Sequence, residues 1–423
     1  MISPRRFLGF SLAYFLVLLD TTVLTIALPD LRADLGGTLA GQQWAVNAYT
    51  VAFAAALLTG GAVADRYGAA RVFRLGVAAF GVLSLLSAAA PALGALVGLR
   101  ALLGVAGALC LGGSLALVAE LYPQAAGRAR AMGLWAAITG TALAAGPLLG
   151  GLLVDLYGWR AVFLINPPVA LLSLLAVRGL RSPAGGRRID WAVQILACGF
   201  LGLLAEALID SSVLAAVLAP AALIALVLVE RRSQAPALPG GLLRATWREL
   251  LAGTVATFAF AGALFVLTLR LQDGEGLSPL AAGLAFLPLT LPMAVNPVLT
   301  GRIVARFGAR PPILAGLALL AAGLAGLALT DVLIPWLVLT GLGLSFCLPA
   351  LVAGMIAATP AGTAGTAGGV LNAARQVGAT IGVAVLARVP SPLTAAAVLV
   401  ALAALAYAVR GRTVTLRSET TAL

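Results

Sequence analysis

Long apolar runs separated by short polar stretches extend along the whole chain. Each run has about 20 residues, the length of helix that crosses the hydrocarbon core of a bilayer. The alternation of apolar and polar positions that would indicate a membrane barrel is absent from the sequence. The pattern predicts an all-α membrane protein with fourteen spanning helices, at residues 7–29, 42–64, 72–90, 93–118, 129–153, 159–178, 190–209, 212–230, 249–270, 278–302, 311–330, 332–357, 366–388 and 391–409.

Composition and charge support this interpretation. Hydrophobic residues make up 61% of the 423 residues and charged residues only 10%, too few to cover the surface of a soluble domain. The net charge is +12, and 21 of the 27 basic residues, all Arg, lie in loops on the same side as the N-terminus. Because positive loops stay in the cytoplasm, we expect a multi-pass cell-membrane protein with both termini cytoplasmic. Lipid, rather than nucleic acid, is then the partner of this chain.

Several chemistries are not expected from the residues present. The chain has no His, and its three Cys residues, Cys110, Cys198 and Cys347, fall in separate apolar segments without metal-ligand spacing. No nucleotide-binding loop, nucleophile elbow or zinc-protease motif occurs. We therefore predict no enzyme activity, no cofactor and no metal, and a transport process driven by a gradient rather than by ATP.

An internal repeat divides the chain into two halves. The sequence GAVADRYGAAR, residues 61–71, follows the second predicted segment, and GRIVARFGAR, residues 301–310, follows the tenth. Repeated halves that enclose a binding site are typical of secondary transporters. We predict a six-helix bundle at 1–180, two extra helices with their loops at 181–245, and a second six-helix bundle at 246–423.

Several of these stretches resemble the major facilitator superfamily, and most closely its branch of 14-helix drug:proton antiporters. The resemblance is carried by LDTTVLTIALP, GAVADRYGAAR, LRALLGVAGA, AAGPLLGG, WRAVFLINPP and GGVLNAARQVGATIGVAVL, in that order along the chain. It implies a fold of two six-helix bundles plus two central helices. It also implies export of hydrophobic drug-like compounds or antibiotics in exchange for protons, by alternating access.

Asp20 and Arg100 are the candidate proton-coupling residues. Both lie deep inside predicted segments, about 14 Å and 10 Å from the same membrane surface by helical rise, and an ionisable residue at such depth indicates function. Asp20 is the only carboxylate that we place well inside the membrane, and segments nine to fourteen are taken to hold none. The family resemblance implies proton transfer at Arg100. The alternative is a pair that only ties helices together.

The resemblance also implies two conformational elements. In the family, the repeated loop latches neighbouring helices, and the small-residue stretch of the fifth helix supports antiport. The alternatives are a plain topogenic loop and ordinary close packing. The corresponding residues are Gly61, Asp65, Arg66, Gly68, Arg71, Gly301, Arg306 and Gly308 for the latch, and Gly146, Pro147, Gly150 and Gly151 for the antiport helix.

Aromatic and amide side chains in the second, tenth and thirteenth segments predict a central cavity for an apolar small-molecule substrate. Core packing is the alternative for each of them. Arg375 has no carboxylate partner in its own half, so it needs backbone carbonyls, the amide of Gln376 or Asn372, a carboxylate from the other half, or an anionic substrate. The predicted lining consists of Trp44, Asn47, Tyr49, Phe286, Asn296, Asn372, Arg375 and Gln376.

Two other functions compete with proton-coupled drug export. One is the dedicated export of a single metabolite, which Arg375 would favour if that metabolite is anionic. The other is a membrane sensor that transports nothing, which is disfavoured because the short loops leave no cytoplasmic domain to relay a signal.

Overall fold

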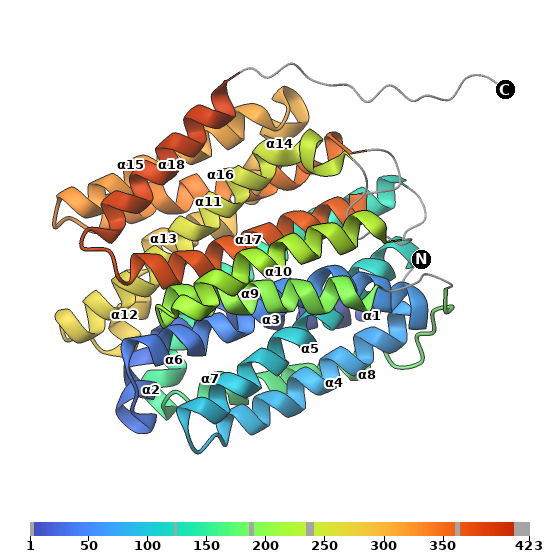
Figure 1. Ribbon diagram of the computed structural model, residues 1–423, viewed down its shortest axis with the longest axis horizontal. Helices are drawn as coiled ribbons and strands as arrows, with labels where there is room; N and C mark the ends of the chain where they lie inside the picture. The colour runs from blue at the N-terminus through green and yellow to red at the C-terminus, as the bar shows by residue number, and fades with distance from the viewer. Residues whose placement is uncertain (1–3, 122–124, 186–189, 234–240, 360–363, 410–423) are drawn as a thin grey trace.

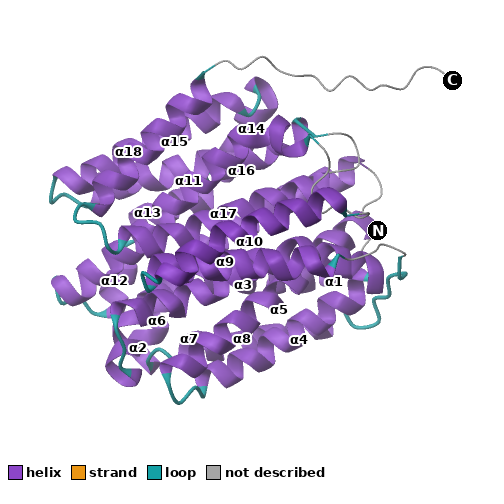
Figure 2. Ribbon diagram, in the orientation of Figure 1, coloured by secondary structure: helices purple, strands orange, loops and turns teal. Residues whose placement is uncertain are grey.

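The computed structural model describes residues 4–121, 125–185, 190–233, 241–359 and 364–409, and the described residues contain helices but no strand (Figure 2). The predicted termini, residues 1–3 and 410–423, lie outside them. The helices are α1 Pro4–Ile26, α2 Leu28–Leu35, α3 Leu39–Tyr67, α4 Ala69–Ala88, α5 Leu93–Leu121, α6 Ala125–Tyr157, α7 Ala161–Leu164, α8 Asn166–Ala176, α9 Trp191–Ile209, α10 Val213–Arg232, α11 Leu242–Leu269, the π-helix η1 Arg270–Gly274, α12 Pro279–Ala285, α13 Leu287–Val295, α14 Pro297–Phe307, α15 Arg310–Leu329, α16 Ile334–Ala357, α17 Ala364–Leu386 and α18 Pro392–Ala408.

Each predicted segment coincides with one helix or with a series of short ones. The segment at 278–302 is divided into α12, α13 and α14. Pro288 and Pro297 occupy the first turns of α13 and α14. Because proline has no N–H to donate to the preceding turn, the breaks fall just before these residues. The segment at 159–178 is similarly divided into α7 and α8.

The count of fourteen spans is not confirmed. Nine described helices are long and apolar enough to cross a membrane, and eleven qualify if each of two bent helix pairs is one span. The difference has a structural origin. The proline breaks leave α12, α13 and α14 each too short to cross a membrane alone, and α18 has only 17 residues. In the count of eleven, α6 and α8 form one bent span with an angle of 117° between them.

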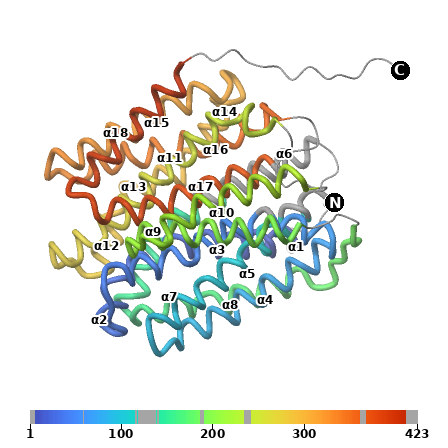
Figure 3. The backbone as a smooth tube through the Cα atoms, in the orientation of Figure 1, coloured from blue at the N-terminus to red at the C-terminus, as the bar shows by residue number. Residues whose placement is uncertain are grey.

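Two large hydrophobic cores form among the described residues, one in each half of the chain, and a small third cluster joins α9 to α17. The first core is built from α1 through α8 and the second from α11 through α18, and a few side chains of each half belong to the core of the other. Across the boundary, α3 lies beside α17, and α6 lies beside α12 and α13 (Figures 1 and 3). The two halves therefore meet mainly where α3 packs on α17 and where α6 packs on α12 and α13.

The helices α9 and α10 lie outside this arrangement. They pack against each other, and α9 also contacts α3 and α17. Only 11% of the apolar window of each helix is buried, and Leu214, Val217 and Ile224 are among the exposed side chains. Because apolar surface of this extent is unfavourable in water, these faces fit a lipid environment.

Candidate functional site

Asp20 of α1 and Arg100 of α5 form an ion pair in the interior of the first half. Each residue is 1% exposed. The Nη1 of Arg100 donates to Oδ2 of Asp20, and its Nε donates to the carbonyl oxygen of Ala45 at 3.0 Å. The sequence prediction that these two residues share a depth thus corresponds to direct contact.

Tyr49 holds the guanidinium group of Arg100 from one side. The centre of the guanidinium lies 4.5 Å from the centroid of the Tyr49 ring, within the range of a cation–π interaction. The hydroxyl of Tyr49 donates to the carbonyl oxygen of Val17 at 2.7 Å, which ties α3 to α1. Gly104 of α5 permits this approach, since a Cβ there would lie 2.4 Å from the carbonyl oxygen of Tyr49.

The second carboxylate oxygen of Asp20 is the polar atom that this arrangement leaves open. Oδ1 is buried and has no hydrogen-bond partner among the described residues, although buried polar atoms are nearly always paired. A proton bound at this oxygen would neutralise the carboxylate and weaken its attraction to Arg100.

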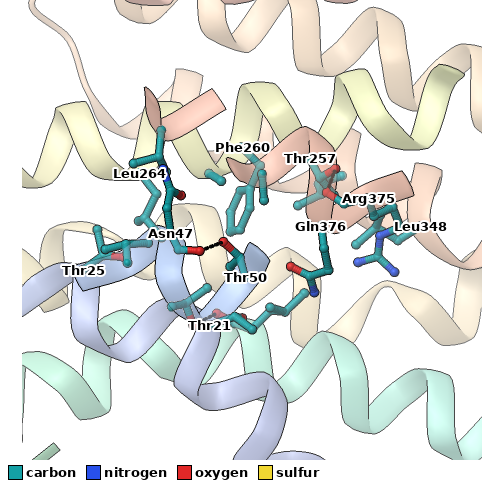
Figure 4. Close-up of a pocket in the computed structure, with 17 residues that line it drawn as sticks. Thr21, Thr25, Asn47, Thr50, Thr257, Phe260, Leu264, Leu348, Arg375 and Gln376 are labelled. Carbon is teal, nitrogen blue, oxygen red and sulfur yellow. Dashed lines mark hydrogen bonds between the residues drawn. The ribbon is translucent and has the colours of Figure 1, made fainter. Parts of the chain in front are cut away.

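A cavity lies directly beside this pair, between the two halves. Thr21 and Thr22, which follow Asp20 in α1, contribute to its wall. It contains about 620 Å³ of space not filled by atoms, including the part open to solvent. The full lining is Thr21, Thr22, Thr25, Val46, Asn47, Thr50, Leu143, Thr257, Phe260, Ala261, Leu264, Leu344, Leu348, Arg375, Gln376, Ala379 and Val383 (Figure 4).

Three of the eight predicted cavity residues line this wall, namely Asn47, Arg375 and Gln376. Arg375 and Gln376 lie at one end of the cavity, and Thr25 and Asn47 lie toward the other (Figure 4). The threonines are the lining residues that sequence reasoning missed. Thr21 and Thr25 are spaced by one helical turn in the DTTVLT stretch, a signal that could have revealed a polar face of α1.

The other five predicted cavity residues lie elsewhere, and we correct their placement. Tyr49 supports Arg100, and Phe286 is fully buried in the second core. Trp44 donates to Asp210 of the α9–α10 turn at 2.7 Å. Asn296 donates to Ser345 at 2.8 Å, and Asn372 accepts from Arg375. The partners of Trp44 and Asn296 lie outside the cavity wall, whereas Asn372 lies behind the wall and contacts the lining residue Arg375.

The predicted absence of carboxylates from segments nine to fourteen is wrong. Glu249 is the first residue of the predicted ninth segment, and α11 begins one to two turns earlier, at Leu242. Its Oε1 accepts a hydrogen bond of 3.2 Å from the hydroxyl of Tyr407 on α18. Glu249 is therefore a structural link between two helices of the second half, and it does not line the cavity.

The first copy of the repeated loop surrounds the turn between α3 and α4. Gly68 has φ +90°, and a Cβ there would lie 2.9 Å from the carbonyl oxygen of Ser182. The carbonyl oxygen of Asp65 accepts from the N–H of Gly185 at 2.7 Å. The side chains of Asp65, Arg66 and Arg71 are exposed. Tyr67, whose ring contacts the guanidinium of Arg66, is exposed as well.

The second copy of the loop has the same turn with a different connection. Gly308 has φ +80°, whereas Gly301 has nothing within 4 Å of a Cβ and Arg306 is exposed. Arg310 donates from Nη2 to the carbonyl oxygen of Ala408 at 2.5 Å. The first copy therefore contacts the loop that follows α8, and the second connects the start of α15 to the end of α18.

The small-residue stretch of α6 makes close contacts on two faces. A Cβ at Gly146 would lie 1.9 Å from Oγ1 of Thr22, and one at Gly150 would lie 2.7 Å from the carbonyl oxygen of Val23. A Cβ at Gly151 would lie 2.4 Å from the carbonyl oxygen of Pro279, the first residue of α12. Pro147 lies inside α6, and α6 thus touches α1 of its own half and α12 of the other half.

Polar contacts join the two halves at the end of the bundle that carries α2. Arg32 pairs with Asp273 at 2.9 Å, and Gln272 donates to the carbonyl oxygen of Ile26 at 2.9 Å. Between α3 and α17, Gln43 donates to the carbonyl oxygen of Val383 at 3.0 Å. The halves are therefore held together at the α2 end.

The same end carries a titratable group with a clear shift. Asp34 of α2 accepts a hydrogen bond from the indole of Trp159 at 2.9 Å and another from Arg160. These two hydrogen bonds hold the pKa of Asp34 below its ordinary value of 3.8. The group is exposed, so it contributes to the stability of the loop contact rather than to the cavity.

Sequence comparison decides the family of this helical arrangement. The profile of the Major Facilitator Superfamily matches residues 10–383. The chain belongs to the major facilitator superfamily. It is a membrane transporter, with a cavity between two helical halves and a buried ion pair beside it.

Relatives of this superfamily member include proteins named for drug resistance. The puromycin resistance protein pur8 of Streptomyces alboniger is 38% identical over 93% of this chain and 84% of its own length. The multidrug resistance protein Stp of Mycobacterium tuberculosis is 36% identical over 89% of this chain and 74% of its own length. The tetracenomycin C resistance and export protein of Streptomyces glaucescens is 35% identical over 90% of this chain and 74% of its own length.

Solved structures share the fold of this transporter. A POT family transporter in complex with 5-aminolevulinic acid superposes with a TM-score of 0.73 at 14% identity, over 96% of this chain and 95% of that one. The human organic anion transporter MFSD10 gives a TM-score of 0.70 at 18% identity, over 96% of this chain and 100% of that one. Both confirm the major-facilitator fold that the sequence predicts.

Proposed function

We propose that this transporter exports hydrophobic drug-like compounds or antibiotics in exchange for protons. The observation that carries the proposal is the buried Asp20–Arg100 pair immediately behind the cavity wall. Thr21 and Thr22 line the cavity and follow Asp20 without interruption, so a movement of α1 that accompanies protonation reaches the substrate site directly. The drug-resistance names of the relatives support the direction and the class of substrate.

The proposed cycle uses the open oxygen of Asp20. With the cavity open to the outside, a proton binds at Oδ1, the carboxylate loses its charge, and the attraction to Arg100 weakens. Arg100 keeps its hydrogen bond to Ala45 and its contact with Tyr49, so α1 is the helix that is released. When the cavity opens inward the proton leaves, and the ion pair forms again.

The proposed topology assigns the α2 end to the outside of the cell membrane and both termini to the cytoplasm. It counts fourteen spans: α12 to α14 form one, α18 forms another, and α6 is separate from α7 and α8. The bundles then comprise residues 1–180 and 246–423, with the extra pair α9 and α10 in 181–245. The distribution of Arg between the two sides supports this orientation.

In the proposed closure, α3 packs on α17 and α6 packs on α12 along the boundary between the halves. The glycine contacts of α6 support its role in antiport, because small residues let α6 pack closely on α1 and on α12 of the other half. The repeated loop is proposed to latch each half at the opposite, cytoplasmic end. Neither role requires a cofactor, a metal or nucleic acid.

The experiment is proton-driven transport by the Asp20→Asn variant in proteoliposomes. We expect that this variant folds and binds substrate but loses transport driven by an imposed pH gradient, because an amide cannot take up the proton. Asp155→Asn is the matched control, since Asp155 is an exposed carboxylate near the end of α6. Undiminished proton-driven transport by Asp20→Asn, with the control unchanged, would contradict the assignment.

A further inference from the structure

The cavity carries one formal charge, and it is positive. Arg375 is the only ionisable side chain among the seventeen lining residues. Asp20 lies close behind the wall, but its charge is compensated by Arg100, to which it is directly paired. The field within the cavity is therefore set by the guanidinium of Arg375 and by the dipoles of hydroxyl and amide groups.

Arg375 has donors that the protein does not use. Its Nη1 donates to Oδ1 of Asn372 at 3.1 Å, whereas its Nε is buried and has no partner among the described residues. No carboxylate in the described part of the chain pairs with it. A guanidinium has five N–H donors, and leaving them unpaired away from water is unfavourable.

The packing around Arg375 holds it at the cavity wall. Its carbonyl oxygen accepts a hydrogen bond of 2.7 Å from Thr257 of α11. Gly253, one turn earlier on α11, leaves room for the stem of Arg375, whose Cγ would lie 3.4 Å from a Cβ at that position. The guanidinium is thus positioned before any ligand enters, which lowers the entropy cost of binding.

The remaining wall offers apolar contacts and only neutral hydrogen-bond donors. Phe260, Leu264 and Leu348 provide an apolar and aromatic surface. The hydroxyl of Thr21 donates to the carbonyl oxygen of Leu18 in the same helix at 2.6 Å. The hydroxyl of Thr50 likewise donates to the backbone carbonyl oxygen of Asn47 at 3.1 Å. Arg375 is consequently the strongest hydrogen-bond donor available to a ligand.

We propose that Arg375 selects the substrate class: apolar, aromatic molecules that bear a carboxylate or a polarised carbonyl group, in preference to organic cations. This inference rests on the proposed export function and adds its specificity. A carboxylate matches the guanidinium in charge and in planar geometry, and both of its oxygens can accept from adjacent N–H groups. A cation in the same position meets a like charge and no compensating carboxylate.

The test is equilibrium binding of three naphthalene probes to the purified protein in lipid nanodiscs. The probes carry a carboxylate, a carboxamide or a trimethylammonium group on the same ring. We expect wild-type protein to bind the carboxylate most tightly and the ammonium most weakly. Arg375→Gln should weaken binding of the carboxylate on the order of 10- to 100-fold, as removal of a charged hydrogen bond does, and should leave the ammonium unchanged or tighter.

Two further variants keep the test decisive if Arg375→Gln folds poorly. Arg375→Lys retains the positive charge and should retain the order of the probes while losing part of the affinity for the carboxylate. Arg178→Gln removes an exposed Arg in the loop after α8 and should change none of the affinities. A wild-type protein without preference for the carboxylate, or an equal loss for all three probes in Arg375→Gln, would overturn the proposal.

This binding assay separates the inference from the proposed function. Binding in nanodiscs needs no proton gradient, so the probe preference stands or fails independently of Asp20. Failure of proton-driven transport with an intact preference would overturn the coupling mechanism alone. Intact coupling without a preference would overturn the role of Arg375 alone.

Discussion

The ion pair between Asp20 and Arg100 allows a quantitative test of how this transporter holds its first half together. Replacing Arg100 by Gln leaves a buried carboxylate without its cation, a change that costs about 3–5 kcal/mol in a protein interior. It also removes the hydrogen bond that Arg100 donates to the carbonyl oxygen of Ala45, and such a bond contributes about 1 kcal/mol to stability. Replacing Asp20 by Asn is milder, because Arg100 keeps Ala45 and the ring of Tyr49 as partners.

The double variant Asp20→Asn with Arg100→Gln should be more stable than Arg100→Gln alone. Its two amides can hydrogen-bond each other and leave no unpaired charge, so we expect the effects of the single variants to differ from additivity by about 2 kcal/mol. The measurement is the free energy of unfolding of the four proteins in mixed detergent and SDS micelles. Additive effects would refute the reasoning that the pair is the unit of stability.

A second cycle provides the matched comparison. Asp34 and Arg160 form an ion pair of the same chemistry, but their side chains are 46% and 42% exposed. Water and salt screen such a pair, so its coupling should be much smaller than that of the buried pair. An equal coupling in the two cycles would show that burial does not determine the strength of the inner pair.

Two further predictions concern helix packing and pH. Gly146→Ala should destabilise the protein by about 1–3 kcal/mol and slow transport in proteoliposomes, because the new Cβ would lie 1.9 Å from Oγ1 of Thr22. Gly199→Ala is the control and should have neither effect, because a Cβ at Gly199 has no atom within 4 Å. Because the folded pKa of Asp34 is lowered from 3.8, its contribution to stability is present above pH 3.8 and is lost as the pH falls through the folded value. Asp34→Asn should therefore reduce the loss of stability at low pH, followed through the fluorescence of Trp159. An acid transition identical to that of the wild-type protein would count against the contact.

The sequence predicts the helices well because their signals are local. The length of each apolar run and the position of proline decide where a helix begins, ends or breaks, as the division of α12, α13 and α14 illustrates. The matching depth of Asp20 and Arg100 also follows from sequence, and pairing of opposite charges is one way to satisfy both in an apolar medium. Their roles in coupling stay predictions.

The composition of the cavity could not be predicted in the same way. The face that a helix turns to the cavity depends on its rotation, which is fixed by close contacts such as the approach of Gly378 to the carbonyl oxygen of Thr254. A rotation of one residue position turns a side chain by about 100°. Tyr49 and Trp44, although near Asn47 in sequence, consequently point to Arg100 and to α9 instead of the cavity.

The most direct test of the central claim is the movement of protons that substrate itself causes. A naphthalene carboxylate probe is added to proteoliposomes loaded with a pH-sensitive dye, without an imposed gradient, and dye signal and probe uptake are recorded together. We predict proton movement opposite to the probe in wild-type protein and in Asp155→Asn, and none in Asp20→Asn. Substrate-dependent proton movement of the same size in Asp20→Asn would contradict the account.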